Sequence, residues 1–309
     1  MEEQIPVSLS YWQDVRKRFF GNKISIVGLA ILVVLILAGI IGPIISGWKY
    51  DDLGPDILAS PGTNGHWFGT DDLGRDIFTR VTFGIRLSLT VAIVVTTISV
   101  FVGVTLGGIA GYFGGVVDSV LMRLTDMFLV TPTIVIGAVI GFRFGNLGVV
   151  PLAVMLGLFA WMGLARFVRT EFLTLREREF VDAARVAGAS DRRIIFKHIL
   201  PNAIGIIVVV GTLLLSGAIL AETALSYLGF GVRPPDVSLG LLISEYQGSF
   251  SISPWLFWWP GTLIISIALC INFIGDGLRD AFDPRQRRRL TKKDKERTKS
   301  QARIAAANE

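Results

Sequence analysis

Long runs without a charged residue most constrain what this chain can fold into. Five runs of 22 to 31 residues contain no Asp, Glu, Lys or Arg: Ile24–Ile45, Leu87–Val117, Phe144–Ala165, Ile199–Ala221 and Tyr246–Gly275. A helix needs about 20 apolar residues to cross the hydrocarbon core of a membrane, so each run is long enough to span it. Only 18% of the chain is charged, whereas a soluble domain has about 25% charged residues.

A sixth apolar run is shorter and has a polar entry. Met127–Phe142 has 16 residues, and extending it back to Leu121 gives spanning length at the cost of Arg123 and Asp126 near one end. We therefore predict an all-α membrane protein with six transmembrane helices. The alternative is a soluble all-α protein, which five such runs together argue against. A signal peptide is also disfavoured, because Ile24–Ile45 is too long and no small-residue cleavage site follows it cleanly.

The distribution of basic residues predicts how the helices are oriented. Lys and Arg number 24 in the N-terminal segment, the entry to the third span, the loop after the fourth span and the C-terminal tail, against 6 on the opposite side. Cytoplasmic loops retain Lys and Arg, so we predict that the N- and C-termini are both cytoplasmic. The net charge of +5 then reflects topology, and we expect no binding to nucleic acid.

These spans divide the chain into five regions. We predict a cytoplasmic N-terminal segment at 1–23, a first transmembrane helix at 24–45, an external loop at 46–83, a five-helix core at 84–282 with a cytoplasmic loop at 166–202, and a charged cytoplasmic tail at 283–309. Within the core we expect a tight turn at 143–148 and an outer loop at 229–253. The tail's basic stretch Lys292–Arg303 suits contact with anionic lipid, with a merely solvated tail as the alternative.

Glycines recur every four residues in two of the predicted spans. They are Gly103, Gly107, Gly111 and Gly115 in the second span, and Gly137, Gly141 and Gly145 in the third. This spacing places them on one helix face, where the missing side chains let another helix approach closely. Glycines that simply face lipid are the alternative.

The sequence contains none of the common catalytic or nucleotide-binding motifs. There is no phosphate-binding G-x-x-x-x-G-K-S/T stretch, His-x-x-x-His pair, acidic calcium loop or G-x-S-x-G motif. The single cysteine, Cys270, excludes an intrachain disulfide and a cysteine metal site. His66 and His198 lie far apart, and we expect both to be ordinary polar loop residues. Energy for uphill transport would therefore have to come from an ion or from another subunit.

The loop after the fourth span predicts a helix, a turn and a second helix. The stretch 171–187 favours a helix, and Gly188 can take the positive φ of a helix end. Ser190 can cap the next helix, which Pro201 is expected to break before the fifth span. Ala183, Ala184 and Gly188 leave one stripe of the first helix almost without bulk, which favours close docking by a partner. A solvated connecting helix is the alternative.

This loop resembles the EAA motif of bacterial ABC importer permeases, which has Glu-Ala-Ala, a Gly four residues on and a hydrophobic-x-Leu-Pro ending. The residues in register are Asp182, Ala183, Ala184, Gly188, Leu200 and Pro201. Asp182 replaces the glutamate of the motif with a shorter acid, and His198 stands where isoleucine is usual.

Other segments resemble the dipeptide/oligopeptide ABC transporter permease family. They are Arg18–Lys23, His66–Asp76, Glu222–Gly229 and Asp276–Arg285. The resemblance covers about Tyr11 to Arg289, and the long first external loop is similar to that of the family's C-type subunit.

The resemblance implies a type I ABC importer permease bundle in the bacterial inner membrane. Such a permease pairs with a homologous second permease, two cytoplasmic ATPase subunits that bind ATP and Mg, and an extracytoplasmic peptide-binding protein. No cofactor is expected in this chain, which is not itself an enzyme. The implied cargo is a dipeptide, a longer peptide, glutathione or a nickel chelate. The residues implied in coupling to an ATPase are Glu179, Asp182, Ala183, Ala184, Gly188, Leu200 and Pro201.

An ion-coupled secondary transporter is the alternative from another functional class. It needs acids at mid-membrane, where buried charges are costly and usually functional. Asp126 and Glu222 are the candidates, but both lie near span ends, so we expect helix-end or interhelical contacts instead. A membrane enzyme is a further alternative, disfavoured by the lack of a catalytic cluster.

Three acids in the first external loop form a last candidate site. Asp71, Asp72 and Asp76 are possible contacts for the binding protein or for a cationic peptide terminus. The simpler expectation is structural, in which they cap helices and pair with Arg75 and Arg80.

Overall fold

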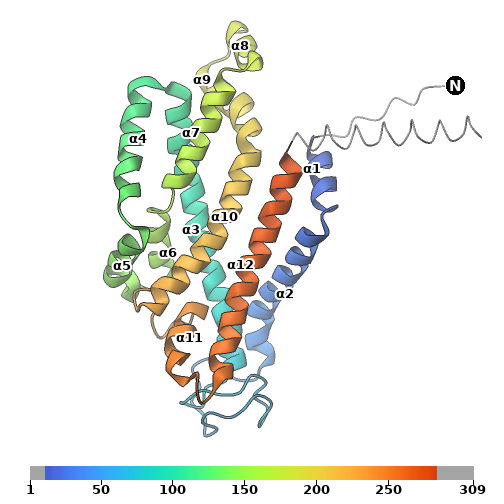
Figure 1. The fold of residues 1–309 in the computed structure, drawn as a ribbon, viewed down its shortest axis with the longest axis vertical. Coiled ribbons are helices and arrows are strands. Elements are labelled where there is room, and N and C mark those ends of the chain that lie inside the picture. Colours follow the sequence, from blue (N-terminus) through green and yellow to red (C-terminus); the bar gives the residue numbers. More distant parts are fainter. Residues whose placement is uncertain (1–10, 284–309) are drawn as a thin grey trace, which may run out of the picture.

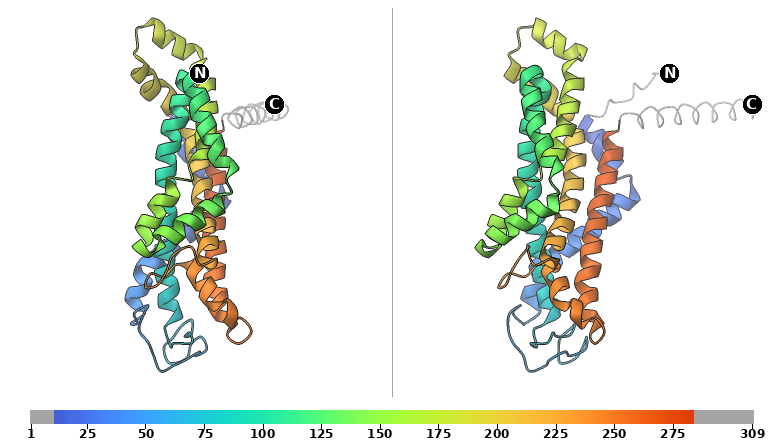
Figure 2. Two further views of the ribbon diagram at one scale, coloured as in Figure 1. Left: turned by 90° about the vertical axis from the view of Figure 1, so that its left-hand side faces the viewer. Right: turned by 60° about the vertical axis from the view of Figure 1, so that its left-hand side comes forward.

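A computed structural model of the chain describes residues 11–283; the tail residues 284–309, including the stretch proposed to contact lipid, lie outside the described residues. The described part is an elongated helical bundle (Figures 1 and 2). At one end stands α8 (Glu179–Val186), and at the other lies the long loop between α2 (Lys23–Ile45) and α3 (Ile77–Phe113). We call these the α8 end and the long-loop end.

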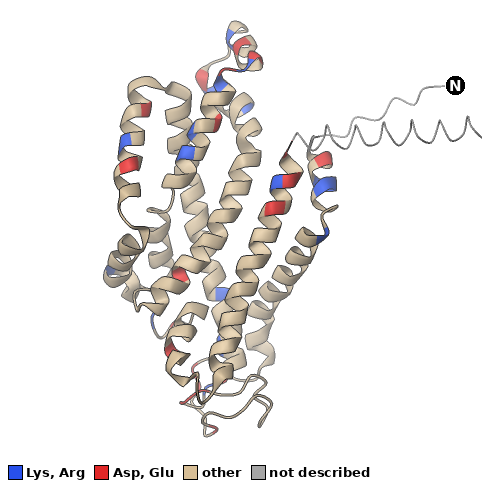
Figure 3. Cartoon of the chain, viewed as in Figure 1, with Lys and Arg blue, Asp and Glu red and all other residues tan. Residues whose placement is uncertain are grey.

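Within residues 11–283, four helices are long and apolar enough to cross a membrane. Two of them are α2 and α3, and the others are α10 (Leu200–Tyr227), together with the turns leading into it, and α12 (Pro254–Phe282). Charged residues lie mostly toward the two ends of the bundle, and its middle is almost free of them (Figure 3). Many apolar side chains of α2 are exposed, as expected for a helix that faces lipid.

The predicted third span is a pair of bent helices, so the prediction of one continuous helix there is wrong. α4 (Gly115–Val130) and α5 (Thr133–Phe144) meet at an angle of 80° across Thr131 and Pro132. Proline disfavours the helical conformation of the residue before it, and Thr131 is extended, with ψ 127°. The short helix η1 (Gly145–Leu147) follows α5.

The predicted fourth span is also bent. α6 (Val149–Gly157) and α7 (Met162–Arg176) meet at 41°. The indole N–H of Trp161 donates to the carbonyl of Leu158 across 2.9 Å, which satisfies a backbone acceptor at the break. α7 continues ten residues past Arg166, where we had placed the end of this span. The structure therefore spans a membrane six times if each bent pair is counted as one crossing.

Two predicted loops contain helix. α3 begins at Ile77, inside the predicted loop 46–83, because the Asp76 carboxylate caps it by accepting from the Thr79 N–H across 2.8 Å. The predicted outer loop 229–253 contains α11 (Leu239–Tyr246) and the short helix η3 (Gln247–Ser249). Ser238 caps α11, so a start signal for this helix was present in the sequence although we predicted only a loop there.

The two ends of the described chain lie side by side. α1 (Tyr11–Phe19) packs against the last turn of α12, where the Trp12 and Phe282 rings meet edge to face with centroids 6.2 Å apart. Arg18 donates to the carbonyl of Asp283 across 3.3 Å. Both helix ends lie toward the α8 end of the bundle (Figure 1).

The glycines of α3 lie where α7 crosses it. A Cβ at Gly103 would stand 3.1 Å from Leu164, one at Gly107 would collide with the carbonyl of Ala165, and one at Gly111 would stand 2.6 Å from the carbonyl of Arg169. Gly115 is different, because it starts α4 and has open space around it. The spacing of four therefore marks the α3–α7 contact up to Gly111 only.

The glycines of α5 lie against a different neighbour. A Cβ at Gly137 would stand 2.8 Å from Leu225 on α10, and one at Gly141 would collide with the carbonyl of Phe230, just beyond α10. The bent α4–α5 pair is thereby held against the long-loop end of α10.

Substitution of Gly107 tests the α3–α7 contact. We expect Gly107→Val to destabilise the purified protein by about 3 kcal/mol, because a side chain there forces two backbones apart. Thermal unfolding in detergent measures the change. The matched control is Gly217→Ala on α10, where a Cβ meets nothing within 4 Å. An unfolding midpoint for Gly107→Val equal to that of the control would contradict the close contact.

Candidate coupling site

α8 and α9 (Asp191–Arg193) form a helical turn that stands beyond the end of the bundle (Figure 1). One residue of α8, Val181, is fully buried, and it belongs to a hydrophobic cluster with Phe172 of α7 and with Ile194 and Ile199 of the following turn. This cluster fixes α8 to the bundle through a single face.

The opposite face of α8 carries most of the predicted coupling residues. Glu179, Asp182, Ala183 and Gly188 are exposed, and Ala184 is half-buried. Val186, an apolar side chain, is 90% exposed. Asp182 pairs with Arg185 of the same helix across 3.1 Å. Glu179, Asp182, Ala183 and Gly188 therefore lie on the exposed side of this segment, whereas Ala184 packs against the Val181 cluster.

The turn after α8 has the geometry expected from the sequence at Gly188, whose φ is +79°. Ser190 occupies the cap position of α9, but its side chain makes no capping hydrogen bond. The helix predicted over 171–187 is interrupted, because α7 ends at Arg176 and α8 begins at Glu179.

Leu200 and Pro201 lie apart from the α8 surface, in the first turn of α10. The prediction that Pro201 breaks the helix is wrong, because helix continues from Asp191 to Tyr227. Proline is tolerated in a first helical turn, where its missing N–H has no partner to lose. The π-helical turn η2 (Ile194–Ile199) leads directly into this turn.

Two residues that were not predicted from the sequence join this site to the bundle. The Tyr112 hydroxyl, on the last turn of α3, donates to the Asp191 carboxylate of α9 across 2.6 Å. Arg176, the last residue of α7, donates to the Tyr112 carbonyl across 2.9 Å. The conspicuous Gly-Tyr-Phe-Gly-Gly sequence at 111–115 was the available signal, since it marks where α3 ends.

A cavity of about 600 Å³ lies between the helices. Its lining is mostly apolar and comes from α3, α5, α7 and α10, with Ser99, Gly137, Phe167 and Leu214 among the residues. Thr96 of α3 also lines it, and its buried hydroxyl has no hydrogen-bond partner within the described residues.

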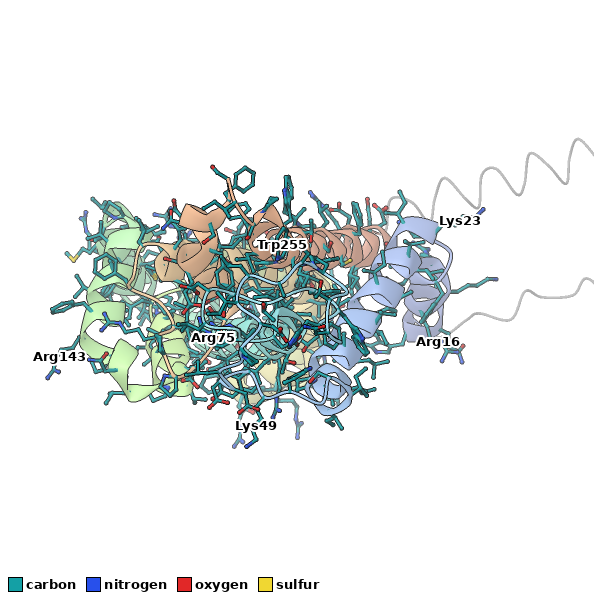
Figure 4. All side chains as sticks on the ribbon, turned by 90° about the horizontal axis from the view of Figure 1, so that it is seen from below. Arg16, Lys23, Lys49, Arg75, Arg143 and Trp255 are labelled. Carbon is teal, nitrogen blue, oxygen red and sulfur yellow. The ribbon has the colours of Figure 1, made fainter. Side chains whose placement is uncertain are left out.

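A network of charges holds the long-loop end together. The buried Asp71 carboxylate accepts from the Arg75 side chain across 2.6 Å and from the Tyr246 hydroxyl of α11 across 3.0 Å. Arg80 of α3 pairs with Glu245 of α11. Burial raises the pKa of Tyr246 well above its usual value, so its hydroxyl stays a donor. Figure 4 shows Arg75 inside this end of the molecule, whereas Lys49 and Arg143 point outward.

The other two acids of the loop differ in exposure. Asp76 is buried at the start of α3 and also contacts the Nδ1 atom of His66 across 2.9 Å. His66 is only 2% exposed and stacks on Trp48, so it is more than the ordinary polar loop residue we expected. Asp72 is exposed. Only Asp72 of the three acids therefore presents its side chain to a partner, and Arg80 pairs with α11 instead of with a loop acid.

The two acids considered for ion coupling both make contacts between elements. Asp126 of α4 pairs with Arg166 of α7, and both side chains are about half-exposed. Glu222 of α10 is buried and accepts from Ser226 across 2.7 Å and from Ser88 of α3 across 3.2 Å. Within residues 11–283, no group of three or more His, Cys, Asp or Glu residues is placed to hold a metal ion.

Neutralising Asp71 tests the charge network. We expect Asp71→Asn to destabilise the protein by roughly 2 kcal/mol, because the change weakens the partner of Arg75 and of the buried Tyr246 hydroxyl. Thermal unfolding and proteolysis of the 46–76 loop measure this. Asp72→Asn, one residue away and exposed, is the control and should behave like the unaltered protein. Equal stability of the two variants would refute the network's role.

Sequence comparisons match most of the chain to a single family. The model for "Binding-protein-dependent transport system inner membrane component" matches residues 103–288, and the model for "N-terminal TM domain of oligopeptide transport permease C" matches residues 10–61.

Curated relatives match over nearly their full length. The oligopeptide transport system permease protein OppC of Mycobacterium tuberculosis is 41% identical over 88% of this chain and 94% of the relative. OppC of Escherichia coli K12 is 40% identical over 90% and 92%. The dipeptide transport system permease protein DppC of Alkalihalophilus pseudofirmus is 38% identical over 91% and 92%.

A solved structure shares the fold. A chain of the MetNI methionine ABC transporter, in an inward-facing conformation, aligns with a TM-score of 0.54 and 20% identity, covering 66% of this chain and 96% of that chain. The predicted type I ABC importer permease bundle is confirmed by this likeness. Taken with the membrane-spanning helices and the family matches, it shows that this multi-pass inner-membrane chain belongs to the family of binding-protein-dependent transport system inner membrane components.

Proposed function

We propose that this chain is a permease subunit of an ATP-driven importer of dipeptides or oligopeptides, and that it forms half of the translocation pathway. The relatives named above are oligopeptide and dipeptide permeases. The observation that carries the mechanism is α8, a short helix fixed to the bundle by the buried Val181 and otherwise open to a partner. Glutathione and nickel chelates are further cargo classes that a test should include.

In this proposal the α8 end faces the cytoplasm and the long-loop end faces outward. The loop-and-tail asymmetry in Lys and Arg supports this orientation. Two ATPase subunits, which bind the ATP and Mg, dock at the α8 end, and one of them receives α8. A homologous second permease completes the membrane bundle. A lipid-anchored or free binding protein delivers the peptide to the long-loop end, where Asp72 is an exposed acid.

Coupling of ATP hydrolysis to transport requires a contact between subunits whose free energy differs between two states of the complex. When the ATPases close on ATP, the groove that holds α8 shifts, and α8 shifts with it. The cluster around Val181 carries this displacement to α7 and to the start of α10, because closely packed side chains move together. Both of those helices line the 600 Å³ cavity, so its shape changes with the state of the ATPases.

The cavity is the part of the pathway that this chain contributes in our proposal. An apolar lining accepts peptide side chains of many kinds without binding any one of them tightly, which suits transport of mixed sequences.

Reconstitution tests the function directly. The complex purified through a tag on this chain should contain a second permease and two ATPase subunits. In proteoliposomes, with binding protein outside, it should take up isotope-labelled peptides from a tryptic digest only when ATP is inside. Uptake that persists without ATP and collapses with an uncoupler would instead support the ion-coupled alternative. Competition by unlabelled dipeptide, glutathione or nickel chelate identifies the cargo class.

Substitution of Gly188 tests the coupling surface. We expect Gly188→Trp to reduce uptake by at least tenfold and to weaken co-purification of the ATPases, because a bulky residue at the edge of α8 blocks docking. Membrane insertion should be unchanged, since nothing in the structure lies within 4 Å of a Cβ at this position.

The matched control for this experiment is Gly47→Trp. Gly47 also has a positive φ, +75°, and open space around it, so the two substitutions impose similar backbone strain. It follows α2 at the long-loop end, at the opposite end of the bundle from α8. If Gly188→Trp transports as well as Gly47→Trp, α8 does not couple this permease to an ATPase.

A further inference from the structure

Tyr112 lies where four elements of the α8 end meet. It is 6% exposed, on the last turn of α3, and its ring belongs to the same hydrophobic cluster as Val181 of α8. Its hydroxyl donates to Asp191 of α9 across 2.6 Å. Its carbonyl accepts from Arg176 of α7 across 2.9 Å.

α3 and α7 are held together by close contacts at this end of the bundle. The Gly103, Gly107 and Gly111 face of α3 lets the two backbones touch. Asp118, in the first turn of α4, forms a bidentate pair with Arg169 of α7, with one of the two contacts at 2.6 Å, so the start of α4 is joined to α7 as well. The bond from Arg176 to the Tyr112 carbonyl closes the end of the pair. A force on Tyr112 therefore moves both helices.

The helices on the two sides of the cavity are connected in different ways to the coupling turn, by which we mean α8 together with α9. α10 is reached through the chain itself, because α9 continues through η2 into it. α7 is also reached through the chain, because only two residues separate it from α8. α3 has no short covalent path from α8 or α9. Besides apolar packing, its direct link to α9 among the described residues is the hydrogen bond between Tyr112 and Asp191. Both walls contribute lining residues, for example Thr96 and Leu164 on one side and Leu214 on the other.

We infer that the Tyr112–Asp191 hydrogen bond is a positioning contact that makes the α3–α7 wall move together with α10 when the coupling turn is displaced. This inference rests on the proposed function and assigns a role within it to two residues. A hydrogen bond to a carboxylate is directional and stronger than one between neutral groups, whereas apolar contacts allow sliding. Losing the bond leaves the turn attached to α7 and α10 through the chain but lets α9 slip against α3.

The test compares variants of the reconstituted complex in the number of labelled peptides imported per ATP hydrolysed, with the tryptic digest as the probe. We expect Tyr112→Phe to lower this ratio by about tenfold, because the phenylalanine ring keeps the apolar packing and removes only the hydroxyl. Asp191→Ala should lower it similarly. Asp191→Asn keeps an acceptor and should restore most of the ratio. The double variant Tyr112→Phe with Asp191→Ala should be no worse than either single variant.

Tyr227→Phe is the matched control, because Tyr227 is exposed at the far end of α10 and the change again removes one hydroxyl. Its ratio should equal that of the unaltered complex. Two results would overturn the inference. One is a normal ratio in Tyr112→Phe. The other is a loss of uptake that is fully explained by a smaller amount of assembled complex. In that case peptide import and ATP hydrolysis fall by the same factor. Absence of ATP-driven uptake in the unaltered complex would overturn the proposed function itself, and this inference with it.

Discussion

The rest of the structure depends on the close contact between α3 and α7. In lipid no hydrophobic force drives helices together, so two spans associate through dispersion contacts that require closely matched surfaces. The glycine face of α3 supplies that match, with Gly107 directly against the carbonyl of Ala165. The contact forms one wall of the cavity, and the hydrogen bond from Arg176 to the Tyr112 carbonyl joins the last residue of α7 to the end of α3. The position of α8 follows from that end point.

The polar groups of this protein lie mostly at the two ends of the bundle, on either side of its apolar middle. At the long-loop end, charges are buried but paired, as in the Asp71–Arg75 pair within the loop and the Arg80–Glu245 pair between α3 and α11. Such pairs contribute little net stability compared with apolar packing, but an unpaired member is costly, so the network favours one arrangement of the loop. At the α8 end the acids and bases are more exposed, as with Asp182 and Arg185. That end keeps its surface free for a partner.

The apolar runs predicted the helical class and the approximate position of every span, because the hydrocarbon core imposes a length that sequence alone can reveal. The breaks within the third and fourth spans were harder to see. The Thr131-Pro132 sequence is a signal for a helix break, but our prediction placed it inside a span. The bend before Trp161 has no proline to mark it. Among site residues, the surface around Gly188 could be predicted from its motif. Tyr112 and Asp191 could not, since they lie 79 positions apart in the sequence and only the tertiary fold brings them together.

The π-helical turn between α9 and α10 explains why an additional link from α9 to α3 matters. Pro201 sits in the first turn of α10 and cannot donate a backbone hydrogen bond, and the six residues before Leu200, Ile194–Ile199, form a π-helical turn. π-helical turns are uncommon and concentrate at functional sites, because their wider winding interrupts the regular hydrogen-bond ladder of the α-helix. If a displacement of α8 reached the bundle through this π-helical turn alone, the turn would deform and take up part of the displacement. The hydrogen bond from Tyr112 to Asp191 lies before the π-helical turn in the chain. It therefore passes the displacement to α3 and α7 before the π-helical turn can take it up.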